Sequence, residues 1–233
     1  MSNPHALPIY VQIAELLARD IAAGHLLDGE RLRPEREMAA ELGISVGTLR
    51  KALGELTSRG LLERRQGSGN YVRNHAGAQN VYAFFRIELL AGGGLPHARL
   101  LSIDRLDKPA DLPEFGRAST AFRIRRLRFL NDPPCVLEEI WLDGSYAPDI
   151  PARDLSESLY LFYRTRLNLW ISSVEDRVGQ GIVPVWADPE FGPPIGSTTG
   201  CFERISFDQD NRRAEFSRNW FDTTRAAYMA RIR

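Results

Sequence analysis

The sequence has few cysteines and histidines and lacks long apolar runs. Its 233 residues include 2 Cys and 4 His. Cys135 and Cys201 lie far apart, and no histidine stands at the spacing of metal ligands, which disfavours a zinc site and a disulfide-stapled secreted scaffold. No run of about 18 apolar residues occurs, and no basic segment followed by an apolar one marks an export signal. We therefore expect a protein of the reducing cytoplasm, with no metal or cofactor.

An excess of either charge is also absent, because 30 basic residues balance 30 acidic ones. Any binding of nucleic acid would therefore have to come from a local basic patch. The polar segment 74–80 has the composition of a linker. Before it lie helical patterns and a strand pair, and after it lie mostly alternating, strand-like runs. This change predicts an α+β protein with one domain in residues 1–73 and another in residues 81–233.

Apolar spacing in the first domain predicts three helices and a hairpin. The first helix spans residues 9–23. The second covers residues 34–42 and starts with proline, and the third follows Ser45, a good N-cap. Two short strands, residues 61–65 and 70–73, flank a Gln-Gly-Ser-Gly turn. A helix-turn-helix followed by a hairpin wing is a shape that docks on DNA.

Gly47 stands on the first turn of the third helix, although glycine inside a helix costs up to about 1 kcal/mol relative to alanine. In a helix-turn-helix this turn enters the major groove, where a bare backbone lets amide groups approach a phosphate or a base edge. Helical hairpins that do not bind DNA show similar patterns. DNA binding is favoured because several residues cluster on the predicted interface. They are Arg36, Thr48, Arg50, Arg64, Arg65 and the Gln-Gly-Ser-Gly turn. Arg59 and Glu63 are expected to be ordinary solvated charges.

In the second domain, residues 121–130 and 135–142 predict a hairpin around Asn-Asp-Pro-Pro. Alternation places Arg126 and Arg128 on one face, with Glu138 on the partner strand. This face either lines a ligand site whose arginines bind an anion or is solvent-exposed with cross-strand Arg–Glu pairs. Further polar candidates come from the start of a helix at Ser156 or Ser158 with Tyr160, and from a last hairpin that carries Glu215.

Residues 7–72 resemble the winged helix-turn-helix of the GntR family of bacterial transcription regulators. The resemblance lies in "PIYVQI", in "ERE.A..LGIS..TLR.AL..L...GLL" and in "RRQGSGNYV". With Gly47 and Arg65 added from the pattern above, the DNA-binding residues that it implies are Arg36, Ser45, Gly47, Thr48, Arg50, Arg65, Gln66 and Gly67. Arg33-Pro34 replaces the usual Pro-Ser, and Val46 replaces an arginine that can read guanine. Each good bidentate contact is worth about 1–3 kcal/mol of discrimination, so we expect an operator unlike the usual one of the family.

Residues 81–230 resemble the UTRA effector-binding domain of the HutC subfamily, an antiparallel-sheet fold similar to chorismate lyase. The segments that carry the resemblance are "RIRRLRFLNDPPCVLEEIWL", "ESLYLFY" and "ERISFDQDNRRAEFSRNWFD". The effector-binding residues that it implies are Phe85, Arg86, Arg126, Arg128, Glu138, Ser158, Tyr160 and Glu215. Phe85-Arg86 stands where Ser or Thr is common, which disfavours a sugar phosphate and leaves another small anion open.

These observations together predict a dimeric bacterial repressor or activator that binds a double-stranded operator and responds to a small anionic effector. Two other classes of protein remain as alternatives. A lyase-like enzyme would need a nucleophile with a base or a metal cluster, and the sequence offers neither. A non-specific architectural DNA-binding protein fits poorly with zero net charge and a large second domain.

Overall fold

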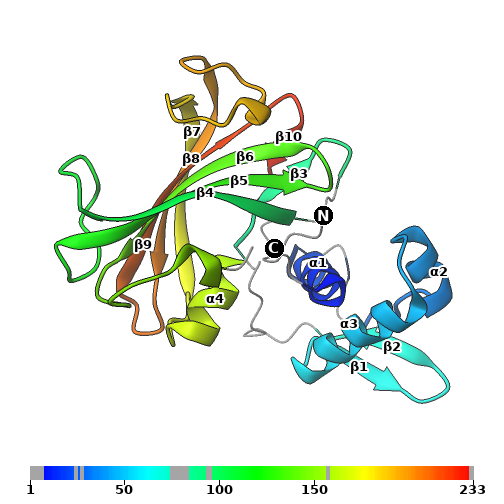
Figure 1. Cartoon of the computed structure of the whole chain (residues 1–233). Coiled ribbons are helices and arrows are strands. Elements are labelled where there is room, and N and C mark those ends of the chain that lie inside the picture. The colour runs from blue at the N-terminus through cyan, green and yellow to red at the C-terminus, as the bar shows by residue number, and fades with distance from the viewer. Residues whose placement is uncertain are drawn as a thin grey trace. The chain divides into compact units, whose positions relative to one another are not determined.

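The computed structural model describes residues 8–23, 26, 29–73, 84–92, 96–155 and 158–230. The chain divides into two compact units, with the boundary between residues 85 and 86 (Figure 1). The predicted linker, residues 74–80, lies outside the described residues. Each unit is therefore considered by itself.

The N-terminal unit has the predicted helices and wing. Its elements are α1 (Ile9–Ala23), α2 (Glu35–Glu41), α3 (Val46–Ser58), β1 (Leu62–Arg65) and β2 (Gly69–Val72). β1 and β2 pair antiparallel, and Arg31 adds a bridge to Tyr71 that the sequence did not reveal. Ser45 caps α3 as predicted, because its side chain accepts a hydrogen bond from the Thr48 amide.

The core of this unit forms where α1 crosses α3. Ile13 and Leu17 from α1 meet Leu49, Leu53 and Leu56 from α3, and all five side chains are buried. Full burial of such a side chain contributes about 1.5–3 kcal/mol. The apolar side chains of α3 thus pack against α1. The opposite face of α3 takes no part in this core and is available to bind a ligand.

The prediction that Arg59 is an ordinary solvated charge was wrong. Its guanidinium lies 2.5 Å from the Glu15 carboxylate, and the two side chains are only 12% and 5% exposed. Arg59 follows the last turn of α3, where α3 packs on α1, so its charge is buried between the helices and has to be paired. Glu63 is 40% exposed and pairs with Arg65 and Arg73 on the wing.

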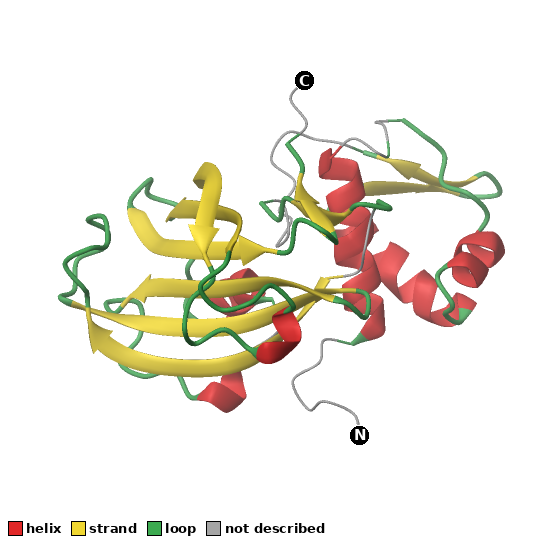
Figure 2. Ribbon diagram, turned by 90° about the horizontal axis from the view of Figure 1, so that it is seen from above, coloured by secondary structure: helices red, strands yellow, loops and turns green. Residues whose placement is uncertain are grey.

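The C-terminal unit is built on one antiparallel sheet of six strands. Its elements are β3 (Ile87–Leu89), β4 (Pro96–Asp107), β5 (Thr120–Leu130), β6 (Pro134–Asp143), η1 (Ala152–Asp154), α4 (Leu159–Arg166), β7 (Ser173–Ile182), η2 (Pro189–Phe191), β8 (Thr198–Phe207), β9 (Arg213–Phe221) and β10 (Ala226–Tyr228). The strand order is β4-β5-β6-β9-β8-β7, and β3 pairs with β10 separately. Figure 2 shows the long strands as one twisted layer. The sequence predicted the hairpin of β5 and β6 and the last hairpin, β8 and β9, and it missed β7.

The two faces of the sheet differ in character. One face carries an apolar cluster that includes Leu127, Leu137 and Trp220, and residues from the β7–β8 connection, such as Val183 and Phe191, cover it. The other face carries charged and hydroxylated side chains and packs against α4. The predicted alternation along β5 is confirmed, because Arg126 and Arg128 lie opposite Glu138 and Val136 on β6.

Candidate DNA interface and effector site

The turn between α2 and α3 is fixed by side-chain hydrogen bonds. The Ser45 hydroxyl accepts from the Thr48 amide at 3.1 Å and lies 2.9 Å from the Thr48 hydroxyl. Ser45 is exposed and Thr48 is half-buried. The first turn of α3 thus presents a capped end and two hydroxyl groups to solvent.

Gly47 is exposed on that first turn, and the fold does not require a glycine there. A Cβ atom at this position would meet nothing closer than the Ser45 hydroxyl oxygen at 3.7 Å. The backbone is helical, so an alanine would fit without strain. The packing of this unit therefore does not explain the glycine, and the close approach of DNA to the backbone at Gly47 stays a prediction.

Arg50 extends from the same helix and is held by an acidic side chain of α2. Its Nε donates to a carboxylate oxygen of Glu35 at 2.6 Å. The Arg50 side chain is 64% exposed and that of Glu35 is 22% exposed, so the guanidinium keeps free donors facing solvent. Arg36, next to Glu35 on α2, is exposed as well.

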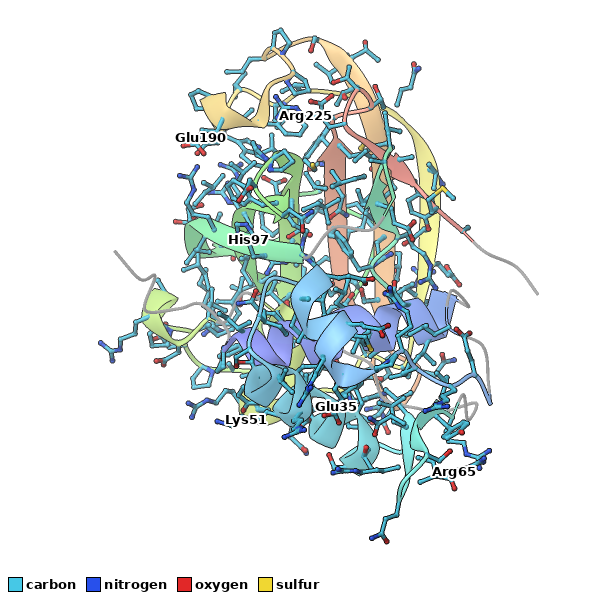
Figure 3. The ribbon with its side chains drawn as sticks, turned by 90° about the vertical axis from the view of Figure 1, so that its right-hand side faces the viewer. Glu35, Lys51, Arg65, His97, Glu190 and Arg225 are labelled. Carbon is cyan, nitrogen blue, oxygen red and sulfur yellow. The ribbon has the colours of Figure 1, made fainter. Side chains whose placement is uncertain are left out.

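The wing adds a second group of predicted DNA contacts. The Arg65 guanidinium lies 4.2 Å from the centre of the Tyr71 ring, a cation–π contact that limits its rotamers. Gln66 and Gly67 form the exposed tip, where a φ of 73° at Gly67 suits the third position of the turn. Figure 3 shows Glu35, Lys51 and Arg65 on the same side of the unit.

In the C-terminal unit, Arg126, Arg128 and Glu138 form a buried ionic cluster. Glu138 lies 2.5 Å from Arg126 and 2.8 Å from Arg128, and all three side chains are buried. Burial alone would raise the pKa of Glu138, but the two guanidinium groups lower it from 4.5 to about 2. The sequence left two alternatives for this face, a ligand site or a solvent-exposed face with cross-strand Arg–Glu pairs. The structure contains the Arg–Glu pairs, and they are buried.

A second buried cluster is centred on Glu215. Its carboxylate accepts from the hydroxyls of Tyr163 at 2.6 Å, Ser206 at 2.9 Å and Tyr160 at 3.4 Å. Burial raises the pKa of Glu215 in spite of these hydrogen bonds and of the nearby charge of Arg126. Glu215 lies on β9, which pairs with β6 and its Glu138, so this cluster lies beside the first one on the same sheet. α4 supplies both tyrosines, so its packing brings the two predicted residues Tyr160 and Glu215 together.

Sequence reasoning missed a third part of this layer. Arg204 on β8 pairs with Asp176 on β7 through two contacts of 2.6 Å, and the Tyr228 hydroxyl donates to Asp176 at 2.5 Å. The Asp176 hydrogen bond raises the pKa of Arg204 although burial opposes it. Ser217 and Asn219 on β9 are buried between these groups and Glu138. The alternating pattern of the last hairpin could have placed Arg204 on this face of the sheet. The β7 segment shows no strand pattern that could have revealed Asp176.

The remaining predicted effector residues lie at the margins of the layer. Ser158 is buried as the N-cap of α4 and accepts from the Leu161 amide at 3.4 Å. Phe85 and Arg86 are half-buried just before β3. The Arg86 carbonyl accepts from the Met229 amide at 2.7 Å, and its charge acts on the pKa of Tyr228. Arg86 is thus linked to the third cluster.

We use the name polar layer for the three clusters together, which comprise Arg126, Arg128, Glu138, Tyr160, Tyr163, Asp176, Arg204, Ser206, Glu215, Ser217, Asn219 and Tyr228. A separate cleft of about 620 Å³ is lined by Asp143, Tyr146, Asp208 and the β8–β9 turn, and none of the predicted effector residues lines it. Among the described residues, no three His, Cys, Asp or Glu side chains could hold a metal ion together. Cys135 and Cys201 are free and buried. In the described part of the chain, no helix has the length and apolar character to cross a membrane.

Comparison with known proteins identifies the family of each domain. Residues 9–72 match the bacterial regulatory proteins of the gntR family, and residues 91–227 match the UTRA domain. The HTH-type transcriptional regulator SmoD of Agrobacterium fabrum is 59% identical over 98% of this chain and 97% of its own. The mannosyl-D-glycerate transport/metabolism system repressor MngR of Escherichia coli is 29% identical over 93% of this chain and 92% of its own. The crystal structure of the possible regulator YydK of Bacillus subtilis has the same fold, with a TM-score of 0.55, 19% identity and coverage of 97% of this chain and all of that one.

Proposed function

Because the chain belongs to the GntR family of bacterial transcription regulators and carries a C-terminal UTRA domain, we propose that it is a dimeric repressor whose operator binding is controlled by a small anionic metabolite in the C-terminal unit. The family and its relatives are regulators, so the chain is not an enzyme. The proposed repression follows that of the E. coli relative MngR, which is a repressor. We place the protein in the bacterial cytoplasm, where the operator is.

The observation that carries the proposal of an anionic effector is the polar layer. It holds three buried arginines, Arg126, Arg128 and Arg204, against the carboxylates of Glu138 and Asp176. Burial raises the pKa of the third carboxyl group, Glu215, which favours its neutral form. Well-packed apolar residues often stabilise a fold as well as buried ion pairs do, so a layer this polar is better explained by ligand recognition.

The same layer provides groups that would orient a hydroxylated anion. Guanidinium groups bind carboxylates and phosphates through paired hydrogen bonds. Ser206, Ser217 and Asn219 add neutral donors and acceptors next to them. We propose that an anion competes with Glu138 for Arg126 and Arg128. The E. coli relative is named for a glycoside of glycerate, and such a molecule combines a carboxylate with hydroxyl groups.

The proposed DNA contact uses the exposed side of α2, α3 and the wing. Ser45, Gly47, Thr48 and Arg50 would enter the major groove, with Arg36 beside them. Arg65, Gln66 and Gly67 of the wing would contact the backbone or the adjacent groove. Non-specific architectural binding would give a ratio of specific to non-specific affinity near one, and we expect a ratio of about a thousand or more.

The effector is sought by thermal shift of the full chain against sugar phosphates, amino acids, phosphonates, aromatic acids and glycosides of hydroxy acids. A ligand at a hundred times its Kd adds about 2.7 kcal/mol of stability, which corresponds to a rise of several degrees in Tm. Substituting the arginines alone would leave Glu138 buried without its partners. The control is therefore Arg126→Met, Arg128→Met and Glu138→Met together, which keeps volume and removes all three charges. A hit that survives in this variant would contradict the proposed anion site.

A further inference from the structure

We propose that the outer edge of β7 pairs antiparallel with β7 of a second copy of this chain, joining two six-stranded sheets into one. The inference rests on the proposed function, because a repressor that binds two operator half-sites has to be a dimer. It adds the surface through which the C-terminal units meet.

β7 ends the strand order of the sheet and has a regular free edge. It pairs with β8 without a bulge from Ser173 opposite Phe207 to Ile182 opposite Thr198. Among the strands of the described residues, none pairs with its other side. The N–H and C=O groups that alternate residues of β7 direct outward form a template for another strand unless something blocks it.

The opposite edge of the sheet, β4, has features that discourage such pairing. It begins with Pro96, a residue without an amide donor, and its register with β5 shifts between Leu100 and Ser102. Proline and bulges are two of the devices by which proteins protect an edge strand. β7 contains no proline and no lysine. The two edges are therefore not equivalent, and β7 is the one open to a partner strand.

β7 also exposes apolar side chains in a pattern that complements itself. Val178 is 51% exposed and Ile182 is 60% exposed, and both lie on the face that carries Val174 and Asp176. A two-fold axis perpendicular to a joined sheet pairs residues of the same face, so it passes through one residue of β7. Centred on Val178, it places that valine against its own copy and Val174 against Ile182.

The charges of β7 agree with this register. Asp176 falls opposite the Gln180 amide, while Glu175 and Arg177 on the other face fall opposite Gly181 and Gly179. No charged side chain meets its like directly across the junction. An axis shifted by one residue toward the N-terminus would oppose two copies of Arg177, and a shift by two residues in that direction would oppose two copies of Asp176; like charges directly opposite destabilise a strand pair. Of these three registers, the one centred on Val178 joins complementary residues throughout.

The junction would also lie next to the polar layer. Asp176 belongs to β7 and holds both Arg204 and Tyr228. A ligand that rearranged Arg204 would act directly on the strand that joins the subunits. The inferred contact therefore gives the proposed effector a short route to the arrangement of the dimer.

Cysteine cross-linking of the full chain tests the register. Val178→Cys would face its own copy within the Cα distance of about 4.5–5.5 Å that a disulfide accepts. Ile182→Cys is the matched control, because its copies would stand about 27 Å apart at 3.4 Å per residue. Mixing Val174→Cys with Ile182→Cys chains should again give cross-linked pairs. Cys135 and Cys201 are buried and stay in place.

We expect a disulfide-linked dimer for Val178→Cys and for the mixture, and a monomer band for Ile182→Cys alone. Sedimentation of the wild-type chain separates the two ways in which the inference can fail. A dimer in solution, with Val178→Cys unlinked or Ile182→Cys linked equally well, would place the interface elsewhere and leave the proposed function standing. A wild-type monomer that still binds its operator would contradict the dimeric repressor itself.

Discussion

The Nε atom of Arg50 lies 2.6 Å from the Glu35 carboxylate, which joins α3 to the first turn of α2. Among the predicted DNA-binding residues, Arg50 thus has an acidic partner on the other helix of the motif. Glu35 positions the guanidinium while its negative charge faces the same side as the proposed phosphate contacts. We therefore expect the Arg50–Glu35 pair to increase the specificity of DNA binding at the expense of total affinity for DNA.

We predict that Arg50→Ala lowers affinity for a selected operator about 5- to 150-fold, because about 1–3 kcal/mol of base discrimination is lost. The fold should remain intact, since an exposed ion pair contributes at most about 1 kcal/mol. Glu35→Gln should raise affinity for random DNA and lower the ratio of specific to non-specific binding. Fluorescence anisotropy on both DNAs measures these changes.

A second ion pair of the same unit is the matched control. Arg33 on the approach to α2 pairs with Glu41, and both side chains are exposed. Arg33→Ala removes the same charge as Arg50→Ala and should leave the ratio of specific to non-specific binding nearly unchanged. Normal footprinting by Arg50→Ala would argue against α3 as the recognition helix.

Gly47→Ala should stabilise the N-terminal unit while weakening operator binding. Alanine gains up to about 1 kcal/mol over glycine in a helix, and the neighbouring atoms leave room for its methyl group. The methyl group would hold the backbone away from DNA. Gly54→Ala is the control on the same helix, since a Cβ there meets nothing within 4 Å, and it should add stability only. Equal operator binding by the two variants would remove the special role of Gly47.

Glu138→Gln should destabilise the C-terminal unit by about 3–5 kcal/mol, because it leaves two buried arginines without their counter-ion. Glu203→Gln breaks a comparable strand-to-strand pair with Arg218, but Glu203 is 40% exposed, so the loss should not exceed about 1 kcal/mol. Urea denaturation of both variants measures the difference. Similar losses would mean that the Glu138 cluster is not a dry ion pair.

The pH dependence of the Glu138 effect has a definite sign. The folded protein lowers the pKa of Glu138 from 4.5 to about 2, so the carboxylate contributes stability above about pH 4.5 and loses that contribution as the pH falls toward 2. The stability gap between wild type and Glu138→Gln should therefore be constant near neutrality and narrow in acid.

Tyr228→Phe should separate effector binding from operator release. Tyr228 joins Asp176 of the polar layer to β10, which pairs with β3, the first described strand after the segment between the two units. The variant keeps Arg126, Arg128 and Glu138, where the anion is proposed to bind, so its effector Kd should change less than its response at the operator. Tyr146→Phe removes a similar bond, to Asp208 at 2.9 Å, away from β3 and β10, and should respond normally. Equal responses of the two variants would exclude this route.

Helical periodicity and strand alternation were sufficient to predict much of the fold. The first helix was predicted with its bounds, because its apolar stripe packs as one face of α1 against α3. The same rule placed Arg126, Arg128 and Glu138 on one face of the hairpin. Periodicity and alternation indicate on which face of a helix or strand a side chain lies. These predictions were reliable where one face of the element was buried.

Local pattern failed where long-range packing decides the environment. β7 reads "SVEDRVGQGI", with three charges and two glycines, and it is held as a strand by β8. Asp176 was missed with it. From the sequence, Arg59 was predicted to be a surface charge. In the structure, α1 places Glu15 next to it. The contact of Glu215 with Tyr163 joins α4 to β9, and no spacing in the sequence encodes that approach.

The central claim is that an anion in the C-terminal unit changes operator affinity. The most direct test is a fluorescence anisotropy titration of a selected operator with the wild-type chain and with the Arg126→Met, Arg128→Met and Glu138→Met variant, each with and without the anion that raises Tm. We predict at least a tenfold change in Kd for wild type, equivalent to about 1.4 kcal/mol of coupling, and none for the variant. An operator Kd that the anion leaves unchanged in wild type would contradict the account.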